Sequence, residues 1–164
     1  MNLFGLRVGN GVDFHKFGEE EGNFEIALGG VLVPFKRKIL AHSDGDVILH
    51  SICDAIFGAI GEGNIGFHFP PSDAKWKDAN SEIFLGYAHN LLTQKGILIN
   101  IDVTVICEEP KIMPISPEIK QNIARILNIN SSQISIKAVT TEKMGFLGRK
   151  EGIGAIATTL VCLH

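Results

Sequence analysis

Apolar residues recur along the chain with two different periods, which separate the expected helices from the expected strands. Residues 44–60 read DGDVILHSICDAIFGAI, and their apolar positions repeat every three or four residues, as on one face of a helix. Gly61 stands where a left-handed residue commonly ends a helix. Residues 97–107, ILINIDVTVIC, alternate instead, which predicts a half-buried strand. The residues expected on its apolar face are Ile97, Ile99, Ile101, Val103, Val105 and Cys107.

The same two periods predict the remaining elements. Further helices are expected at residues 81–94 and 116–127, and further strands near residues 8–12, 134–139 and 153–163. Ser116 is the expected N-cap of the third helix, with Pro117 in its first turn. The segment FEIALGGVLVPF has two β-rich runs around Gly29 and Gly30, which is typical of a hairpin. Residues 64–78 are expected to form a loop.

This order of elements predicts one domain, residues 1–164, of the α/β (α+β) class. It would contain a mixed β-sheet with helices packed on one face, plus a β-hairpin. The strands at 97–107 and 153–163 offer more apolar surface than one helical layer covers, so we expect a homo-oligomer. The alternative is a monomer whose sheet is partly solvated.

Composition narrows the class of protein. With 164 residues, 45% apolar and 20% charged, and a mean hydropathy of +0.20, the chain is long and apolar enough for a substantial core. A net charge of −3 with scattered Lys and Arg argues against a nucleic-acid partner. The longest apolar runs are too short for a transmembrane helix, so no membrane partner is expected.

The cysteines and the N-terminal sequence bear on the compartment. Cys53, Cys107 and Cys162 are odd in number and lie far apart in apolar runs, which is typical of reduced core thiols. The segment MNLFGLRVGNGV lacks the basic and apolar regions of an export signal, and no Arg- and Ser-rich extension precedes the first strand. We therefore expect a cytoplasmic protein of bacterial type.

Candidate metal ligands lie in two segments. GVDFHKFG places Asp13 and His15 two residues apart, on one face of an expected strand, and LAHSDGDVILH places His50 on the expected helix. Two imidazoles and one carboxylate leave a fourth position open, as in catalytic zinc sites, but they also suit ferrous iron in an oxygenase. A buried Asp–His pair without a metal is the third interpretation. Asp46 or Asp54, at four-residue spacing from His50, is expected to orient its ring.

A second group of chemically active side chains lies in AVTTEKMGFLGRKEG. Thr140 and Thr141 offer hydroxyls, Glu142 a carboxylate and Arg149 a guanidinium, beside glycines that let a ligand approach the backbone. These groups suit phosphate, although an inert loop between two strands has the same composition. CEEPKIMP, with Lys111, likewise suits a plain strand-to-helix connection. The sequence contains neither a P-loop nor a G-x-G-x-x-G motif.

Four motifs together carry a resemblance to a known family. GVDFHKF, LAHSDGDVILH, PKIMP and TTEKMGFLGRKEGI resemble the 2-C-methyl-D-erythritol 2,4-cyclodiphosphate synthase family, nearly end to end. The resemblance implies a phosphorus–oxygen lyase of the non-mevalonate isoprenoid pathway. Such an enzyme cyclises 4-diphosphocytidyl-2-C-methyl-D-erythritol 2-phosphate, a small cytidine diphosphate, and releases CMP. The resemblance also implies a homotrimer, with sheets facing the trimer centre and active sites between subunits.

The resemblance assigns roles to individual residues. It implies zinc at the two imidazoles and the carboxylate named above, and a second ion, magnesium or manganese, near Glu142 with the substrate phosphates. It implies that His42 and Thr140 stabilise the transferring phosphoryl group. Substrate contacts are implied for Ser43, Asn64, Ile65, Gly66, Asp73, Cys107, Pro110, Lys111, Ile112, Met113, Thr141, Phe146 and Arg149.

The chain departs from the family pattern at four positions. Asn10, Asn64, Pro71 and Val139 stand where His, Asp, Asp and Thr are usual. These changes leave the metal ligands intact and concern the contacts to the ribose and the diol. Two other classes of function stay open at this point: an iron-dependent oxygenase, and a trimer that binds a small molecule or an isoprenoid without catalysis.

Overall fold

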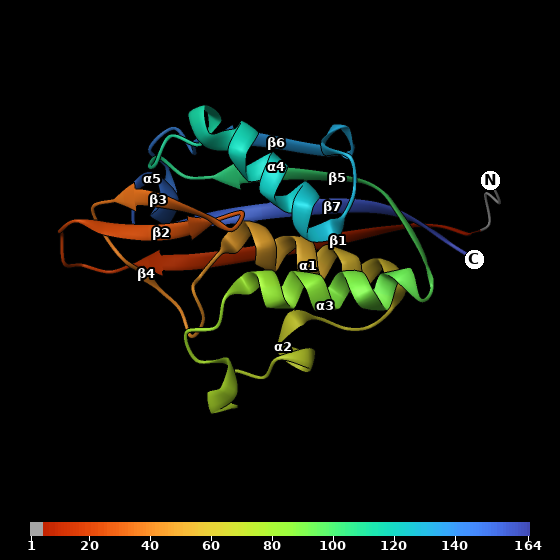
Figure 1. Ribbon diagram of the computed structural model, residues 1–164. Helices are drawn as coiled ribbons and strands as arrows, with labels where there is room; N and C mark the ends of the chain where they lie inside the picture. Colours follow the sequence, from red (N-terminus) through yellow and green to blue (C-terminus); the bar gives the residue numbers. More distant parts are fainter. Residues whose placement is uncertain (1–4) are drawn as a thin grey trace.

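A five-stranded mixed sheet runs through the computed structural model, which describes residues 5–164 (Figure 1). Residues 1–4 lie outside the described residues. They begin the N-terminal segment in which no export signal is expected. The strand order is β4-β1-β7-β5-β6, in which β5 and β6 are parallel and the other neighbours antiparallel. The bounds are β1 Leu6–Phe17, β4 Ile39–Leu40, β5 Gly96–Ile106, β6 Ile134–Val139 and β7 Gly152–Leu163. A separate antiparallel pair, β2 Phe24–Leu28 and β3 Val31–Phe35, turns at Gly29 and Gly30.

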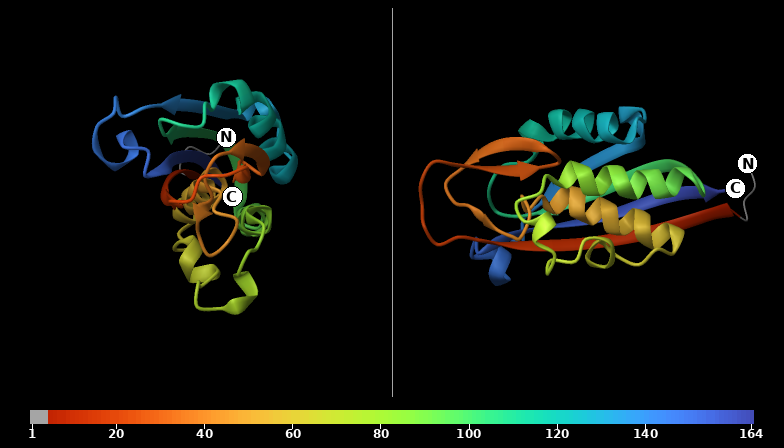
Figure 2. Two further views of the ribbon diagram at one scale, coloured as in Figure 1. Left: turned by 90° about the vertical axis from the view of Figure 1, so that its left-hand side faces the viewer. Right: turned by 60° about the horizontal axis from the view of Figure 1, so that its bottom comes forward.

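Three longer helices in the described part of the chain cover one face of this sheet (Figures 1 and 2). They are α1 Val47–Ile60, α3 Ser81–Thr93 and α4 Ser116–Leu127. α1 packs against β1 and β7, α3 packs against α1, and α4 packs against β6. The predicted mixed sheet with helices is therefore confirmed.

Short helical turns lie in the connections between the longer elements, and two of them fall in the loop predicted at residues 64–78. They are α2 Ile65–His68, η2 Ala74–Trp76, η3 Met113–Ile115, η4 Ser131–Gln133 and α5 Gly145–Gly148. α2 and η2 belong to a segment that extends away from the sheet beyond α1 and α3 (Figure 2). Among residues 5–164, no helix combines the length and the apolar character needed to cross a membrane.

Two glycines of β1 let α1 lie directly on the strand. A Cβ at Gly9 would overlap the carbonyl oxygen of Ala55, and a Cβ at Gly11 would overlap that of Ser51. Because side chains alternate along a strand, Asp13 and His15 share this α1-facing side of β1. The close packing thus fixes the distance between these two side chains and the first turns of α1.

α1 begins at Val47 rather than at Asp44, because Asp46 is its N-cap. The Asp46 carboxylate accepts the backbone N–H groups of Ile48 and Leu49 at 3.1 and 3.0 Å. It also accepts the two hairpin glycine N–H groups at 2.9 and 2.6 Å. Burial raises the pKa of Asp46, and the hydrogen bonds from the N–H groups of Leu49, Gly30 and Gly29 oppose that rise. One buried carboxylate therefore joins the hairpin to the start of α1.

The predicted apolar face of β5 is wrong over its first residues. The pairing with β7 shifts register between Leu98 and Asn100, so Leu98 is buried whereas Ile97 is 58% exposed. After the irregularity, Ile101, Val103 and the following alternate residues point into the core as predicted.

The start of α4 also differs from the prediction. Ile115 occupies the N-cap position without a side-chain bond, and the Ser116 hydroxyl donates to the carbonyl of Met113 at 2.9 Å.

Cys53 and Cys107 are buried, Cys162 is partly buried, and all three are free thiols, as expected.

Candidate metal centre

β1 and α1 bring two imidazoles and a carboxylate to one point. Asp13 Oδ2 lies 2.9 Å from His15 Nε2 and 3.1 Å from His50 Nδ1, and the two ring nitrogens are 3.2 Å apart. A tetrahedral zinc ion with bonds of about 2.0–2.1 Å separates its ligands by about 3.3 Å. The three donor atoms therefore have nearly the spacing that such an ion requires. Among residues 5–164, no other three His, Cys, Asp or Glu side chains bring their ligand atoms within 4.8 Å of one another.

The electrostatics of this cluster favour an ionised Asp13. Burial disfavours the charged form, but the hydrogen bonds and charges of His15 and His50 outweigh it and hold the pKa of the Asp13 carboxyl well below its usual range. Burial likewise lowers the pKa of His50, but the Asp13 carboxylate outweighs it and leaves this pKa raised. Asp13 is thus a carboxylate at neutral pH, as a metal ligand must be.

Two serines contact the other nitrogen of the His50 ring. Nε2 lies 2.7 Å from the Oγ of Ser81 and 3.3 Å from the Oγ of Ser43. The Ser81 hydroxyl donates to the carboxylate of Asp44. Ser81 was not predicted as a partner of His50, because a serine at the start of a distant helix looks like an ordinary capping residue.

The two carboxylates expected to orient His50 have other partners. Asp46 caps α1 and faces the hairpin, because it precedes the helix instead of lying within it. Asp54 accepts the backbone N–H of Ile65 at 2.6 Å and so anchors the segment that begins with α2. The predicted contact of either residue with His50 is therefore wrong.

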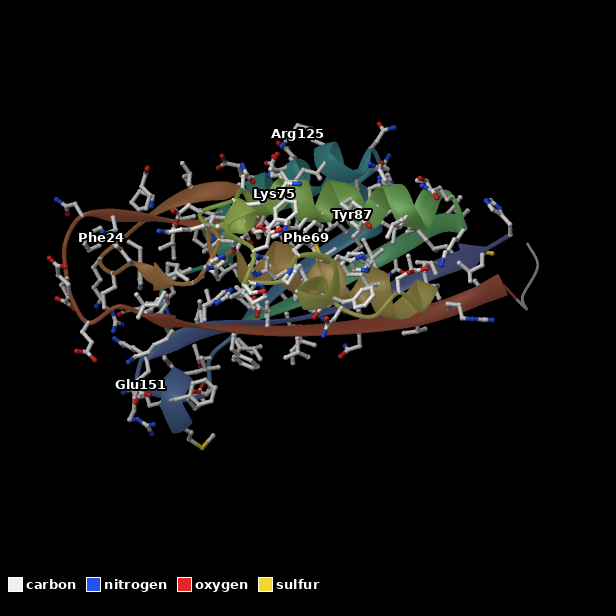
Figure 3. The ribbon with its side chains drawn as sticks, turned by 90° about the horizontal axis from the view of Figure 1, so that it is seen from below. Phe24, Phe69, Lys75, Tyr87, Arg125 and Glu151 are labelled. Atoms are coloured by element: carbon white, nitrogen blue, oxygen red, sulfur yellow. The ribbon has the colours of Figure 1, made fainter. Side chains whose placement is uncertain are left out.

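A hollow of about 210 Å³ opens beside the cluster. Its lining is Asp13, His15, His42, Ser43, His50, Ile65, Gly66, Phe69, Pro71, Trp76 and Phe84. Aromatic rings form one wall: the Phe69 ring centroid lies 4.9 Å from that of Trp76 and 4.5 Å from that of Phe84. Figure 3 shows Phe69 over the helical layer, near Lys75 and Tyr87.

A second hollow, of about 320 Å³, gathers most of the residues expected around the nucleotide. Its lining is Cys107, Pro110, Lys111, Ile112, Met113, Pro114, Ala138, Val139 and Thr140. Cys107 Sγ donates to the Pro110 carbonyl at 3.5 Å, and burial raises the pKa of this thiol to about 11. Cys107 is therefore a neutral, apolar part of the wall at pH 7.

The segment between β6 and β7 lies on the other side of the sheet from the cluster. Phe14 alternates with Asp13 along β1, and its ring packs edge-to-face against Phe146 with 5.9 Å between centroids. Figure 3 shows α5 and Glu151 on the side of β1 opposite to α1 and α3. Glu142, in the same segment, is thus not part of the Asp13 cluster of its own chain.

The remaining predicted site residues line neither hollow. They are Asn64, Asp73, Thr141, Glu142, Phe146 and Arg149. Asn64 and Asp73 cap α2 and η2, each accepting a backbone N–H at 3.0 Å. Within one chain, the predicted site residues are therefore not brought together in a single pocket.

Glu109 joins three segments around the second hollow. Its carboxylate lies 2.9 Å from Lys36 Nζ, after β3, and 2.7 Å from Lys150 Nζ, before β7. Beside it, the Glu108 carboxylate accepts the backbone N–H of Lys143 at 3.1 Å. The hydrogen bonds from Lys150 and then Lys36 lower the pKa of Glu109 to about 2.

Glu109→Gln should lower the free energy of unfolding by about 1 kcal/mol at pH 7, a small value because both lysines are solvent-exposed and screened. The pKa of Glu109 falls from 4.5 to about 2 on folding, so its contribution exists above pH 4.5 and disappears as the pH falls toward 2. Urea unfolding of both proteins across this range measures the difference.

The matched control is Glu19→Gln, since the Glu19 side chain is 92% exposed and its carboxylate lies 3.7 Å from Lys16 Nζ. It should unfold like the parent protein at every pH. A Glu109→Gln difference that stays constant down to pH 2 would contradict the ionic explanation.

The family model described as the YgbB family matches residues 6–162. A 2-C-methyl-D-erythritol 2,4-cyclodiphosphate synthase of Acinetobacter baumannii is 50% identical over 157 residues, which cover 95% of this chain and 96% of the relative. The same enzyme of Cereibacter sphaeroides is 51% identical over 154 residues, covering 93% and 95% of the two chains.

Solved structures are also similar to this chain. The CDP complex of Plasmodium falciparum IspF has a TM-score of 0.85 and 41% identity, over 97% of each chain. The bifunctional IspDF of Campylobacter jejuni has a TM-score of 0.91 and 41% identity, and the match covers 97% of this chain and 42% of that one.

Proposed function

The chain belongs to the YgbB family and has the cyclodiphosphate synthase activity of isoprenoid biosynthesis, a lyase activity, and from this premise we propose how its residues act. The proposed substrate is 4-diphosphocytidyl-2-C-methyl-D-erythritol 2-phosphate. An oxygen of its 2-phosphate attacks the β-phosphorus, the new P–O bond closes the ring, and the bond from that phosphorus to the CMP oxygen breaks. The Asp13, His15 and His50 cluster is the observation that carries this proposal.

Charge repulsion sets the main barrier that the site must overcome. At about 4 Å and an effective dielectric constant of about 20, two unit negative charges repel each other by about 4 kcal/mol. The attacking phosphate is already ionised at neutral pH, so the reaction needs no general base. The protein has to hold the two phosphate groups in line and neutralise their charge.

We assign the metal ligands on donor type and spacing. Asp13, His15 and His50 are proposed to hold zinc, which supplies a positive charge that polarises a phosphoryl oxygen. Glu142 is proposed to hold magnesium or manganese together with the substrate diphosphate. His42 and Thr140 are proposed to donate hydrogen bonds to the transferring phosphoryl group.

A homotrimer would bring the two hollows together. The side of β1 and β7 away from α1 exposes an apolar row whose exposed fractions run from 66% to 37%: Val8, Val12, Phe14 and Ile156. We propose that this face lies toward the trimer centre, and that the Cys107–Met113 hollow of one subunit approaches the metal cluster of the next. The separation of the two hollows within one chain supports an active site between subunits.

The proposed substrate contacts follow from this arrangement. Those beside the metal cluster are Ser43, Asn64, Ile65, Gly66 and Asp73, and those of the neighbouring subunit are Cys107, Pro110, Lys111, Ile112, Met113, Thr141, Phe146 and Arg149. The exposed amide of Asn64 is proposed to take the place of the usual carboxylate beside the ribose. The proposed location is the cytoplasm, which the bacterial relatives support.

Metal removal tests the proposal. Purified protein should contain about one zinc ion per chain, and treatment with a strong zinc chelator should abolish CMP release, because the phosphate groups then repel without neutralisation. Zinc and magnesium added together should restore the rate. Metal analysis and a CMP-release assay on one sample provide both measurements.

Two results would reject the proposal in favour of the other classes. Iron in excess of zinc, without CMP release, would favour the oxygenase. Bound metal and intact trimers without CMP release would favour the binding protein.

A further inference from the structure

The hydrogen bonds around Ser81 determine where its single proton lies. Ser81 Oγ lies within hydrogen-bond distance of two groups, the Asp44 carboxylate and His50 Nε2. A carboxylate can only accept a hydrogen bond, so the Ser81 hydroxyl donates its proton to Asp44. The oxygen of Ser81 is then left with lone pairs facing the imidazole.

This arrangement in turn determines the form of the His50 ring. Since Ser81 Oγ acts as the acceptor at 2.7 Å, Nε2 must carry a hydrogen. In the neutral ring the lone pair is therefore on Nδ1, the nitrogen that lies 3.1 Å from Asp13 Oδ2 and 3.2 Å from His15 Nε2. Nδ1 is the atom that a metal in this cluster would contact.

Backbone hydrogen bonds hold Asp44 where its carboxylate accepts the Ser81 proton. Its carboxylate also accepts the backbone N–H of Ser81 at 2.8 Å and that of Asp46 at 3.2 Å, while its own N–H donates to the Ala79 carbonyl at 3.2 Å. Ser81 has no exposed surface. The start of α3 is thus fixed against the segment that leads into α1.

We infer that Ser81 and Asp44 are positioning residues for the metal site, forming an Asp44–Ser81–His50 relay that holds the ring with Nδ1 free to bind the ion. The inference rests on the proposed function, because it assigns the purpose of the relay to zinc binding at Asp13, His15 and His50. Partners of metal-binding imidazoles generally change metal affinity by 10- to 100-fold. The relay should act on affinity without touching the substrate.

Zinc affinity, measured by competition with a chromophoric chelator, tests this inference. Ser81→Ala should weaken zinc binding by about 10- to 100-fold, and Asp44→Asn should also weaken it, because an amide can donate to Ser81 and reverse the bond to Nε2. The matched control is Ser51→Ala, since Ser51 is equally buried, follows His50 directly and donates only to the Ile48 carbonyl. It should bind zinc like the parent protein.

A second measurement shows which nitrogen of the His50 ring carries the proton. Long-range ¹H–¹⁵N spectra of the zinc-loaded parent protein should show the proton of His50 on Nε2, and Ser81→Thr, which keeps the hydroxyl, should restore both affinity and spectrum relative to Ser81→Ala. Unchanged affinity in folded Ser81→Ala, or a proton on Nδ1 in the parent, would overturn the relay. A parent protein that binds no zinc would instead reject the proposed function.

Discussion

His50→Ala should slow CMP release about a thousandfold while the chain still folds. A metal that polarises a phosphoryl group contributes several kcal/mol to transition-state stabilisation, and about 4 kcal/mol corresponds to about three orders of magnitude in rate. The substitution removes the ligand contributed by α1 and leaves Asp13 and His15 on β1. The CMP-release rate at saturating substrate, zinc content and far-UV circular dichroism are the measurements.

His89→Ala is the matched control for this experiment. Like His50, His89 lies on a long helix, α3, but it is only partly buried and lines neither hollow. Its variant should keep the zinc content and rate of the parent protein. If folded His50→Ala retained zinc and turned over at the parental rate, the assignment of the metal centre would be wrong.

Gly11→Ala should lower the free energy of unfolding by about 3 kcal/mol, the upper end of the usual penalty for overpacking. The added methyl group would overlap the Ser51 carbonyl oxygen and press on the backbone nitrogen of Ala55 at 2.7 Å. Since both contacts are main-chain atoms of α1, the helix itself has to move. Denaturant midpoints measure the loss of stability, and zinc content should fall with it because His50 shifts away from Asp13.

Gly86→Ala, the same substitution at another glycine, should stabilise the protein instead. Gly86 lies inside α3, and a Cβ there meets no atom within 4 Å. Replacing a helical glycine by alanine in open space should stabilise the protein by about 0.5–1 kcal/mol. If both substitutions changed the free energy of unfolding equally, the effect of Gly11→Ala could not be attributed to its contact with α1.

The periodicity of the chain predicted most of the fold because each element has a clear apolar face. The alternation in β1 put Asp13 and His15 on one side, and the helical period put His50 on α1. β5 was less predictable, since a single irregularity at Leu98 exchanges the two faces and leaves no mark in the sequence. The start of α1 was misplaced because acidic residues are common both before and within the first helical turn.

The cluster of candidate metal ligands could be predicted from the sequence, but the contacts that support it could not. Asp46 looked like a partner of His50 from its spacing, whereas the hairpin glycines, brought close by tertiary packing, take up its carboxylate. Ser81 reaches His50 only because α3 begins beside Asp44. The contacts of Glu109 likewise join segments that are remote in the sequence.

The close seating of α1 on Gly9 and Gly11 would also govern how the proposed metal centre takes up its ion. The three ligand atoms are already 2.9–3.2 Å apart in the folded chain. The three side chains therefore lose their conformational freedom when the chain folds, and the binding of an ion does not have to supply that entropy cost. The centre should consequently combine high affinity with discrimination by size, since ions that require longer bonds would have to push a helix away from a strand.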